Sequence, residues 1–489
     1  MSHLLPPELW SHIFSLASDE DIILYPGLPT SFVPAAWYRY TFTPQLTLRT
    51  PQKALCILQC FAKPTKTSIV ATCKAWRGLG TEVLMRCLFF SHIDDLFELA
   101  GCLAADPERG RWTRRLHVEH YGLGEWGDSE IYVDLLRDII QHFPNLEIFI
   151  LDWRPMALCF GDVAGTLGKY CRNLRTAYWH ATVALVPKVI WVLDKLPNLV
   201  SVHLQFSTSA SPHTVATTGE LPLGVVESVH LTLPTLQELS LHGHAPLIIK
   251  QASGWSLPSL RYFSFESRSN EVSVHDVVGF LAAHGARLVF LDLNCITALD
   301  FPTILDLCPV VGTFCFNPDW PQAHADAGLE ATTAPTQTRM PAIWKLVNRP
   351  HAHITQIGLH GLLFAFGVGL EPLAHMDSPA YQRANDIYFG LLASREAFPR
   401  LERVRVLCRV VLSNMVSKSG PSVVSGTECR ERWERWCGVC EELGVRLEDC
   451  TGALLKDLPS RADDHSNNRH LVKDYMAHAR IIHAARHVM

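Results

Sequence analysis

The chain has 489 residues, with 43 lysines and arginines against 48 aspartates and glutamates, and therefore a formal net charge of −5. Hydrophobic residues make up 48% of it and charged residues 19%, compared with roughly 25% charged residues in an average soluble domain. This composition excludes a mostly disordered chain, and without excess positive charge we expect no nucleic acid partner. The length predicts two to four domains or an array of repeats.

Neither membrane insertion nor export is expected. The longest clean apolar stretch, 361–370, is about half of the roughly 20 residues that a membrane-spanning helix needs. The opening MSHLLPPELW has no basic region and places prolines where a signal peptide has its apolar run. We therefore expect a cytoplasmic or nuclear protein, in which the 15 cysteines are mostly free thiols.

The first informative segment is 4–17. Pro6 suits the beginning of a helix, where a missing N–H costs little. Leu9, Ile13 and Leu16 then recur at helical spacing. The pattern predicts a short helix with a broad apolar face.

The next hundred residues predict more helices around an irregular region. Segment 18–51 is rich in proline and aromatic residues, and we expect it to be an irregular excursion. Helical patterns return at 53–62 and 68–89. Gly78 and Gly80 weaken the second of these, so a break is expected there.

Beyond residue 110 a six-position pattern, Leu-x-x-apolar-x-apolar, recurs nine times. Each copy predicts a short strand with one buried face, and helical patterns lie between the copies. The leading positions are Leu146, Leu174, Leu199, Leu236, Leu260, Leu288, Val311, Ile354 and Leu401. Weaker copies around Leu116 and Leu447 open and close the series. Most spacings fall in or near the 20–29 residues of leucine-rich repeats, which fold by stacking because no single copy can bury its apolar face. The alternative is an ordinary α/β domain whose strands begin with leucine.

Within the predicted strands, the residues between the apolar positions are free to vary and would form a recognition surface. We expect them to face away from the buried side of each strand. They include Glu147, Ile148, Arg175, Thr176, Gln237, Glu238, Ser240, Ser264 and Asp292.

The two amino-terminal helical segments carry a family resemblance. Leu5-Pro6-Pro7-Glu8-Leu9, followed by Ile13 and Leu16, resembles the opening helix of an F-box, whose motif reads Leu-Pro-x-Glu-Leu. The sequence VATCKAWR at 70–77 resembles the second half of that motif, Val-Cys-Lys-x-Trp-Arg, with Thr72 in the usual valine position. The family's halves usually lie close together, whereas about fifty residues separate them here. F-box-like proteins of mushroom-forming fungi are similar in having an insertion at this point, followed by leucine-rich strands.

The resemblance covers 4–17 and 53–90 by motif and the rest by architecture only. It implies docking on a Skp-type adaptor, which tethers the chain to a cullin-based ubiquitin ligase, and a protein substrate, of unknown identity, bound by the repeats. The residues that match the adaptor interface are Pro6, Leu9, Ile13, Leu16 and Trp76. A leucine-rich-repeat scaffold with no role in ubiquitin transfer is the alternative within binding proteins.

The expected fold class is therefore α/β, a small helical F-box-like domain followed by an irregular leucine-rich-repeat solenoid. The expected domains are 1–90 with an insertion at about 18–52, the solenoid at 91–455, and a polar, histidine-rich tail at 456–489 that is partly disordered or a short helix.

One sequence motif suggests redox chemistry. Trp436-Cys437-Gly438-Val439-Cys440 resembles the thioredoxin-like signature, in which a helix N-terminus lowers the pKa of the first thiol. The preceding residues, 428–436, are charged and helical in period, so we expect the motif to lie inside a helix. That helix would pack Trp433, Trp436 and Cys440 onto the last repeats. A thiol oxidoreductase that uses Cys437 and Cys440 is the alternative from another class.

The same cysteines are also candidate metal ligands. Cys437 and Cys440 have zinc-like spacing with Cys429 and Cys450 nearby, but the second ligand pair of a zinc site is missing. The remaining candidates, interpreted as loop histidines, are His242, His244, His351 and His353. We expect no catalytic residues, no metal and no cofactor, and hence no enzyme.

Overall fold

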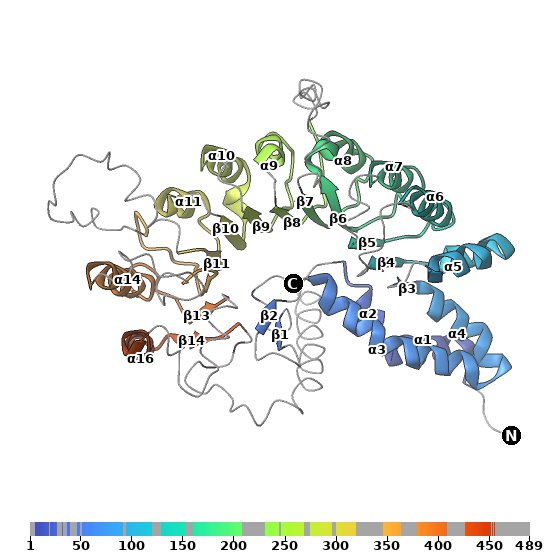
Figure 1. Ribbon diagram of the computed structural model, residues 1–489, viewed down its shortest axis with the longest axis horizontal. Coiled ribbons are helices and arrows are strands. Elements are labelled where there is room, and N and C mark those ends of the chain that lie inside the picture. Colours follow the sequence, from blue (N-terminus) through green and yellow to red (C-terminus); the bar gives the residue numbers. More distant parts are fainter. Residues whose placement is uncertain are drawn as a thin grey trace. The chain divides into compact units, whose positions relative to one another are not determined.

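The structure is a computed structural model of the chain (Figure 1). It describes residues 5–18, 20–26, 32, 37–39, 46–48, 51–90, 94–119, 129–152, 160–207, 230–243, 246–267, 274–295, 300–318, 346–362, 379–407, 426–450, 452 and 454. The predicted tail at 456–489 and most of the apolar stretch at 361–370 lie outside these residues. None of the described helices is both long enough and apolar enough to cross a membrane.

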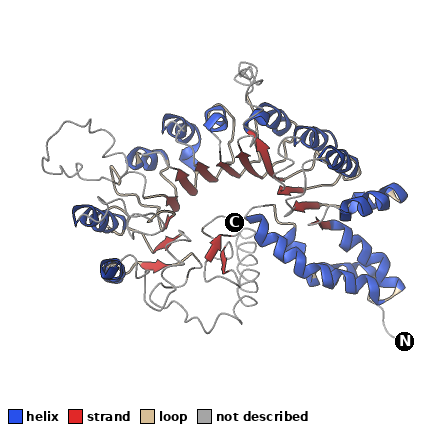
Figure 2. Cartoon of the chain, in the orientation of Figure 1, coloured by secondary structure: helices blue, strands red, loops and turns tan. Residues whose placement is uncertain are grey.

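Helices and strands alternate along most of the described chain (Figure 2). The helices are α1 (Pro7–Ala17), α2 (Glu20–Ile23), α3 (Pro51–Thr72), α4 (Lys74–Arg86), α5 (Asp94–Ala105), η2 (Pro107–Trp112), α6 (Ser129–Ile140), α7 (Phe160–Tyr170), η5 (Val183–Leu185), α8 (Val186–Asp194), α9 (Pro246–Ala252), α10 (Val274–His284), η7 (Gly285–Arg287), α11 (Phe301–Leu307), α14 (Pro379–Leu392) and α16 (Gly426–Glu442). The strands are β1 (Trp37–Arg39), β2 (Leu46–Leu48), β3 (Cys87–Phe90), β4 (Arg115–Glu119), β5 (Ile148–Asp152), β6 (Thr176–Thr182), β7 (Ser201–Ser207), β8 (Glu238–Gly243), β9 (Tyr262–Ser267), β10 (Phe290–Cys295), β11 (Thr313–Phe316), β12 (Gln356–Leu359), β13 (Arg403–Val406) and β14 (Arg446–Glu448).

The fold class is α/β, as predicted. Strands β3 to β14 belong to a 12-stranded parallel sheet in which each strand neighbours those next to it in the sequence. Parallel neighbours require a crossover connection, and in most cases the described part of that crossover contains a helix, such as α6 between β4 and β5. This order is compatible with a repeat-like fold. Strands β1 and β2 form a separate antiparallel pair.

The chain forms two compact units. The first contains the described residues of Met1–Leu28 and Thr50–Leu260, and the second those of Pro29–Arg49 and Arg261–Tyr475. The first unit therefore holds the amino-terminal helices together with strands β3–β8, and the second holds β1, β2 and β9–β14. The domain boundaries expected at residues 90 and 455 stay predictions.

The repeated apolar positions form the core of the first unit. Leu116, Phe149, Ala177, Val202 and Leu239 are partners in register from β4 to β8, and each is at most 2% exposed. The second apolar position of each copy forms a parallel buried row, which consists of Val118, Leu151, Trp179, Leu204 and Leu241. In the second unit the corresponding row runs from Phe263 to Leu447 through β10–β13. The predicted strands and their buried faces are therefore confirmed.

Short polar side chains join successive turns of the first unit. Nδ2 of Asn145 donates to the backbone carbonyl of Arg111 at 2.8 Å, and Nδ2 of Asn173 donates to that of Pro144 at 3.4 Å. Asn198 repeats this bond to Arg172 at 3.1 Å. The hydroxyls of Thr235 and Ser259 do the same one and two repeats later. In this unit the polar residue before each leading leucine thus bonds to a carbonyl of the preceding turn and joins successive copies.

Three local expectations were wrong. The break in the second helical pattern falls at Cys73, whose sulfur accepts a hydrogen bond from the backbone N–H of Trp76 and caps α4. The glycines at 78 and 80 lie inside that helix. The helix ends at Arg86, because the next four residues form strand β3, which precedes the predicted first strand of the sheet. The excursion at 18–51 also contains regular structure, namely α2 and the β1–β2 pair.

The sheet face that carries the variable strand positions is more buried than expected. Ile148 and Thr176 are each 1% exposed and Asp292 is 4% exposed. Ile148 packs in an apolar cluster with Ile150 and Tyr178, and the Thr176 hydroxyl bonds to the carbonyl of Pro26. The expectation of an open recognition surface is therefore wrong at these positions.

Histidines line part of this face in the first unit. His203 of β7 stacks between Tyr178 and His242, with ring centroids 4.4 Å from each. His242 also bonds to Ser240 at 2.8 Å. His242 is thus a strand residue, which corrects the loop interpretation, while His353 lies in a turn as expected. His244 lies outside the described residues.

Candidate functional site

The first helix is defined by its two prolines and a serine. Pro6, in extended conformation, precedes α1, and Pro7 occupies its first turn, where the missing N–H has no partner to lose. The backbone N–H groups of Leu9 and Trp10 donate to the carbonyl of Pro6. At the other end, the hydroxyl of Ser18 donates to the carbonyl of Phe14 at 2.6 Å. The helix predicted at 4–17 is therefore confirmed, with its ends fixed locally.

One side of α1 packs on the second half of the predicted motif. Phe14 is 2% exposed and forms a core cluster with Ile69 of α3 and Val83 of α4. Trp76, from the Cys-Lys-x-Trp segment, lies with its ring centroid 4.7 Å from that of Trp10 and 4.9 Å from that of Phe14. Aromatic pairs at such distances add to the free energy of area burial. The two distant segments of the sequence thus fold as one helical cluster.

The other side of α1, together with Leu5 just before the helix, exposes large aliphatic side chains. Leu5 is 41%, Leu9 48%, Ile13 40% and Leu16 52% exposed. These four residues, spaced at three or four positions, form what we call the α1 apolar face. Contiguous apolar surface of this kind is typical of interaction sites.

The residues predicted for the adaptor interface divide into two groups. Pro6, Leu9, Ile13 and Leu16 are all exposed on or beside the α1 apolar face. Trp76, on α4, is half-buried, and its ring packs on Trp10 and Phe14 of α1, so it supports the helix that carries the face. Sequence reasoning missed Leu5, although it is the first leucine of the motif.

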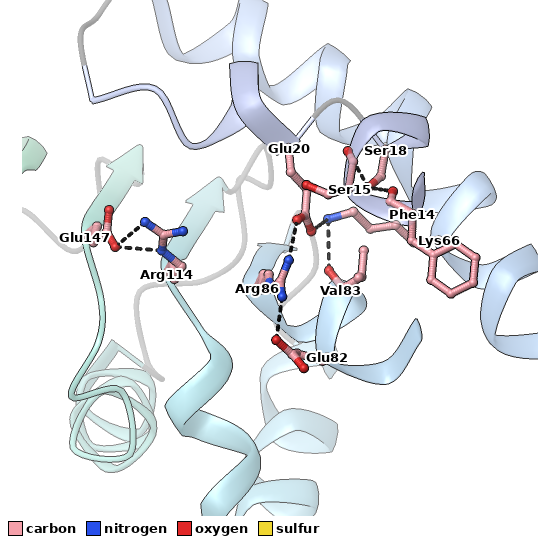
Figure 3. A network of polar contacts seen from close by, with 10 residues as sticks. All are labelled: Phe14, Ser15, Ser18, Glu20, Lys66, Glu82, Val83, Arg86, Arg114 and Glu147. Carbon is pink, nitrogen blue, oxygen red and sulfur yellow. Dashed lines mark hydrogen bonds and ion pairs between the residues drawn. The ribbon is translucent and has the colours of Figure 1, made fainter. Parts of the chain in front are cut away.

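A buried ionic cluster fixes the chain just after α1 (Figure 3). The Glu20 carboxylate, 2% exposed, lies 3.4 Å from Nζ of Lys66 and 3.0 Å from Nη1 of Arg86. Lys66 also donates to the carbonyl of Val83 at 3.2 Å. Because both partners of Glu20 are present, the desolvation of its charge is offset, whereas removing one partner would leave a buried charge uncompensated.

Arg86 extends this cluster toward solvent. Its Nη2 lies 2.5 Å from Oε1 of Glu82 one turn earlier in α4. Burial alone would lower the pKa of Arg86, but Glu82 and Glu20 hold it above its usual value. The guanidinium therefore stays charged and links α2 to the end of α4. No motif revealed Glu20, because its partners lie 46 and 66 residues away.

The same region is anchored to the sheet. Arg115, on β4, is fully buried and donates from Nη1 to the carbonyl of Ile23 at 2.9 Å. Chain segments from α2, α4 and β4 are thus joined within the first unit. These contacts hold in place the helices on which α1, and with it the α1 apolar face, packs.

The cysteine motif of the second unit lies inside α16, as predicted. Trp436 stacks on Phe389 of α14, with ring centroids 4.1 Å apart and an interplanar angle of 4°, and Trp433 and Cys440 are buried. Burial and the neighbouring Cys437 raise the pKa of Cys440 to about 12. Cys437, the first thiol, lies well inside α16 and not at the helix N-terminus that would lower its pKa in a redox motif, so the arrangement favours packing over catalysis.

Among the described residues, no group of three or more His, Cys, Asp or Glu side chains is placed to hold a metal ion. Cys450 is buried, and the side chain of Cys429 lies outside what the structure describes. His351 bonds through Nε2 to the carbonyl of Cys308 at 3.0 Å.

Comparisons with known proteins leave the chain without an assigned family. The sequence matches no model of a known protein family and no curated protein. Its function therefore has to be argued from the residues described above.

Proposed function

We propose that the chain is the substrate-recognition subunit of a Skp–cullin–F-box ubiquitin ligase and acts in the cytoplasm or nucleus. In this proposal the helical cluster of α1, α3 and α4 is an F-box-like domain, which docks on a Skp-type adaptor. The strand and helix units after it are leucine-rich repeats of a solenoid, which bind a protein substrate. The chain contributes binding surfaces and no catalytic residues.

The observation that carries the proposal is the two-sided character of α1. One side packs Trp10 and Phe14 against Trp76, while the other exposes Leu9 and Ile13. A monomer gains nothing from exposing Leu9, Ile13 and Leu16 on one short helix with Leu5 just before it, whereas a partner that covers them gains their burial. Anchor residues at the centre of such interfaces are each worth about 2 kcal/mol or more.

The repeat part is supported by register and connectivity. Strands follow one another in chain order with equivalent apolar positions paired, and in the first unit the polar residue before each leading leucine bonds to the preceding turn. Stacked units of this kind produce extended binding surfaces.

The test is the affinity of the purified chain for a purified Skp-type adaptor, measured by isothermal titration calorimetry. The double variant Leu9→Ala/Ile13→Ala should weaken binding by at least about a hundredfold, since two anchors are removed. Because both side chains are exposed in the free chain, the thermal midpoint should change little.

The matched control is Ile131→Ala, which truncates a 55% exposed isoleucine of α6 in the same unit. It should bind the adaptor like the wild type. Wild-type chain that fails to bind the adaptor, or a double variant that binds equally well, would leave the chain as a repeat scaffold without a ubiquitin role.

A further inference from the structure

An open groove of about 800 Å³ runs along one edge of the first unit. It begins beside the end of α4 and follows the turns that precede strands β4 to β8. Four arginines and two glutamates line it, namely Arg86, Arg111, Arg114, Arg175, Glu82 and Glu147. The groove is therefore locally basic, although the chain as a whole carries a formal charge of −5.

Most of these charges are already compensated. Arg86 is paired with Glu82 and Glu20, and Arg114 lies 2.5 Å from Glu147 (Figure 3). Because Arg114 holds Glu147, that carboxylate is not paired with Arg175 in the next turn.

Arg175 is the uncompensated cation of the groove. It is exposed, and its backbone N–H and carbonyl bond to the neighbouring turns, which fixes its position directly before β6. Within the described part of the chain its guanidinium has no ion pair. Arg111, which lines the groove beside Trp112, is paired with Glu108, and both side chains are more than 60% exposed. Such exposed pairs are worth little and are easily exchanged.

The groove also offers hydrogen-bond acceptors at regular intervals. Asn145, Asn173 and Asn198 each line it while donating from Nδ2 to the turn before. Since an amide has both donor and acceptor atoms, this bonding leaves the Oδ1 atoms available to accept N–H groups. Trp112, 37% exposed, adds an aromatic surface.

We propose that this groove binds an extended acidic segment of a partner protein. A carboxylate or phosphate of the segment pairs with Arg175, whose planar guanidinium suits two-point contact with either group. Main-chain N–H groups of the segment donate to the asparagine Oδ1 atoms. A protein segment is favoured over RNA, because the asparagine Oδ1 atoms accept main-chain N–H groups, which a sugar–phosphate backbone does not have.

The binding itself is independent of the adaptor, whereas identifying the segment as a ligase substrate rests on the proposed function. The groove proposal and the adaptor proposal can therefore be refuted independently of each other. Loss of adaptor binding in Leu9→Ala/Ile13→Ala should leave peptide binding unchanged, because Leu9 and Ile13 do not line the groove.

The test uses the full chain and fluorescein-labelled twelve-residue probes in fluorescence anisotropy. The probes are a peptide of alternating Glu and Ala, its phosphoserine and Gln counterparts, and a twelve-nucleotide uridylate. We expect the Glu or phosphoserine peptide to bind at least about tenfold more tightly than the Gln peptide, because the Gln peptide cannot form a hydrogen bond with Arg175 in which both groups are charged. Tighter binding of the Glu peptide would identify a carboxylate as the preferred anion, and tighter binding of the phosphoserine peptide would identify a phosphate.

The decisive variant is Arg175→Gln, which should weaken the acidic probe by about tenfold. Its matched control is Arg172→Gln, an exposed arginine three residues earlier that does not line the groove, and it should bind like the wild type. Equal binding of the acidic and Gln peptides, equal loss in both variants, or tighter binding of the uridylate than of any peptide would overturn the proposal.

Discussion

Gly80 allows α3 and α4 to approach closely, and replacing it with alanine should loosen the helical cluster. A Cβ at position 80 would lie 2.8 Å from Cγ2 of Ile69 and 3.1 Å from Cγ2 of Val70. The first distance is shorter than real Cβ contacts. Ile69 is buried and β-branched, and such side chains rarely change χ1 in a helix.

Two opposing effects set the magnitude. Replacing glycine by alanine inside a helix stabilises it by up to about 1 kcal/mol. Inserting a methyl group into a tightly packed contact costs about 1–3 kcal/mol. Gly78 provides the matched control, because it lies in the same helix and a Cβ there meets nothing within 4 Å. Gly78→Ala should therefore be neutral or stabilising, and Gly80→Ala should be about 1–3 kcal/mol less stable than this control.

The assay is native-state hydrogen exchange of the α3 and α4 amides, because a chain of this length does not unfold in a single step. A difference of 1.4 kcal/mol corresponds to a tenfold change in an equilibrium constant. We therefore expect these amides to exchange about tenfold faster in Gly80→Ala than in Gly78→Ala. Equal rates in the two variants would refute the close packing of α4 on α3.

Three further predictions concern buried charge and acidity. Glu20→Gln leaves the ammonium of Lys66 buried without a counter-charge and should destabilise the first unit by about 3–5 kcal/mol, seen as a lower thermal midpoint; an unchanged midpoint would contradict the buried cluster. Burial, followed by two neighbouring histidines, holds the pKa of His203 well below 6.5, so only the unfolded chain takes up this proton and stability falls as pH drops below about 6.5. His203→Phe should reduce the loss in thermal midpoint between pH 7.5 and 5.5, and an equal loss in both proteins would argue against it. Iodoacetamide at pH 8, followed by peptide mass spectrometry, should label the exposed Cys73 and leave the buried Cys440 intact, and labelling of both at similar rates would show that α16 is not packed as described.

The repeat pattern predicted the sheet because its signal is local. Two apolar residues in alternation mark a strand, and the leading leucine marks the turn before it, so register followed from the sequence alone. Strand β3 was not predicted, because it continues directly from α4 and the sequence CLFF has no leucine three residues before its first paired apolar residue. The helix break was misplaced for a related reason: glycine weakens a helix in general, but Gly80 lies inside α4 where Ile69 comes close, and the actual break depends on the cap supplied by Cys73.

The candidate site was predictable only in part. The spacing of Leu9 and Ile13 identified an apolar helix, and the motif resemblance suggested which face would be free. Nothing in the sequence could show that Trp76 turns its ring toward α1, or that Glu20 would find Lys66, since these contacts join segments far apart in the chain. The buried face of the strands was also missed, because a threonine such as Thr176 looks equally suited to solvent or to a backbone carbonyl.

The asparagine bonds between turns bear on how such a chain can change in length. Asn173 bonds to the carbonyl of Pro144, and Asn198 to that of Arg172, so neighbouring copies of the first unit are joined by a side-chain donor of one turn and a carbonyl of the turn before. Deleting half a copy would separate a side-chain donor from the backbone carbonyl that it bonds to in the preceding turn. Gain or loss of whole copies, each with its own Asn, Thr or Ser before the leading leucine, keeps these bonds. Duplication of such copies is the inexpensive route by which this array could grow.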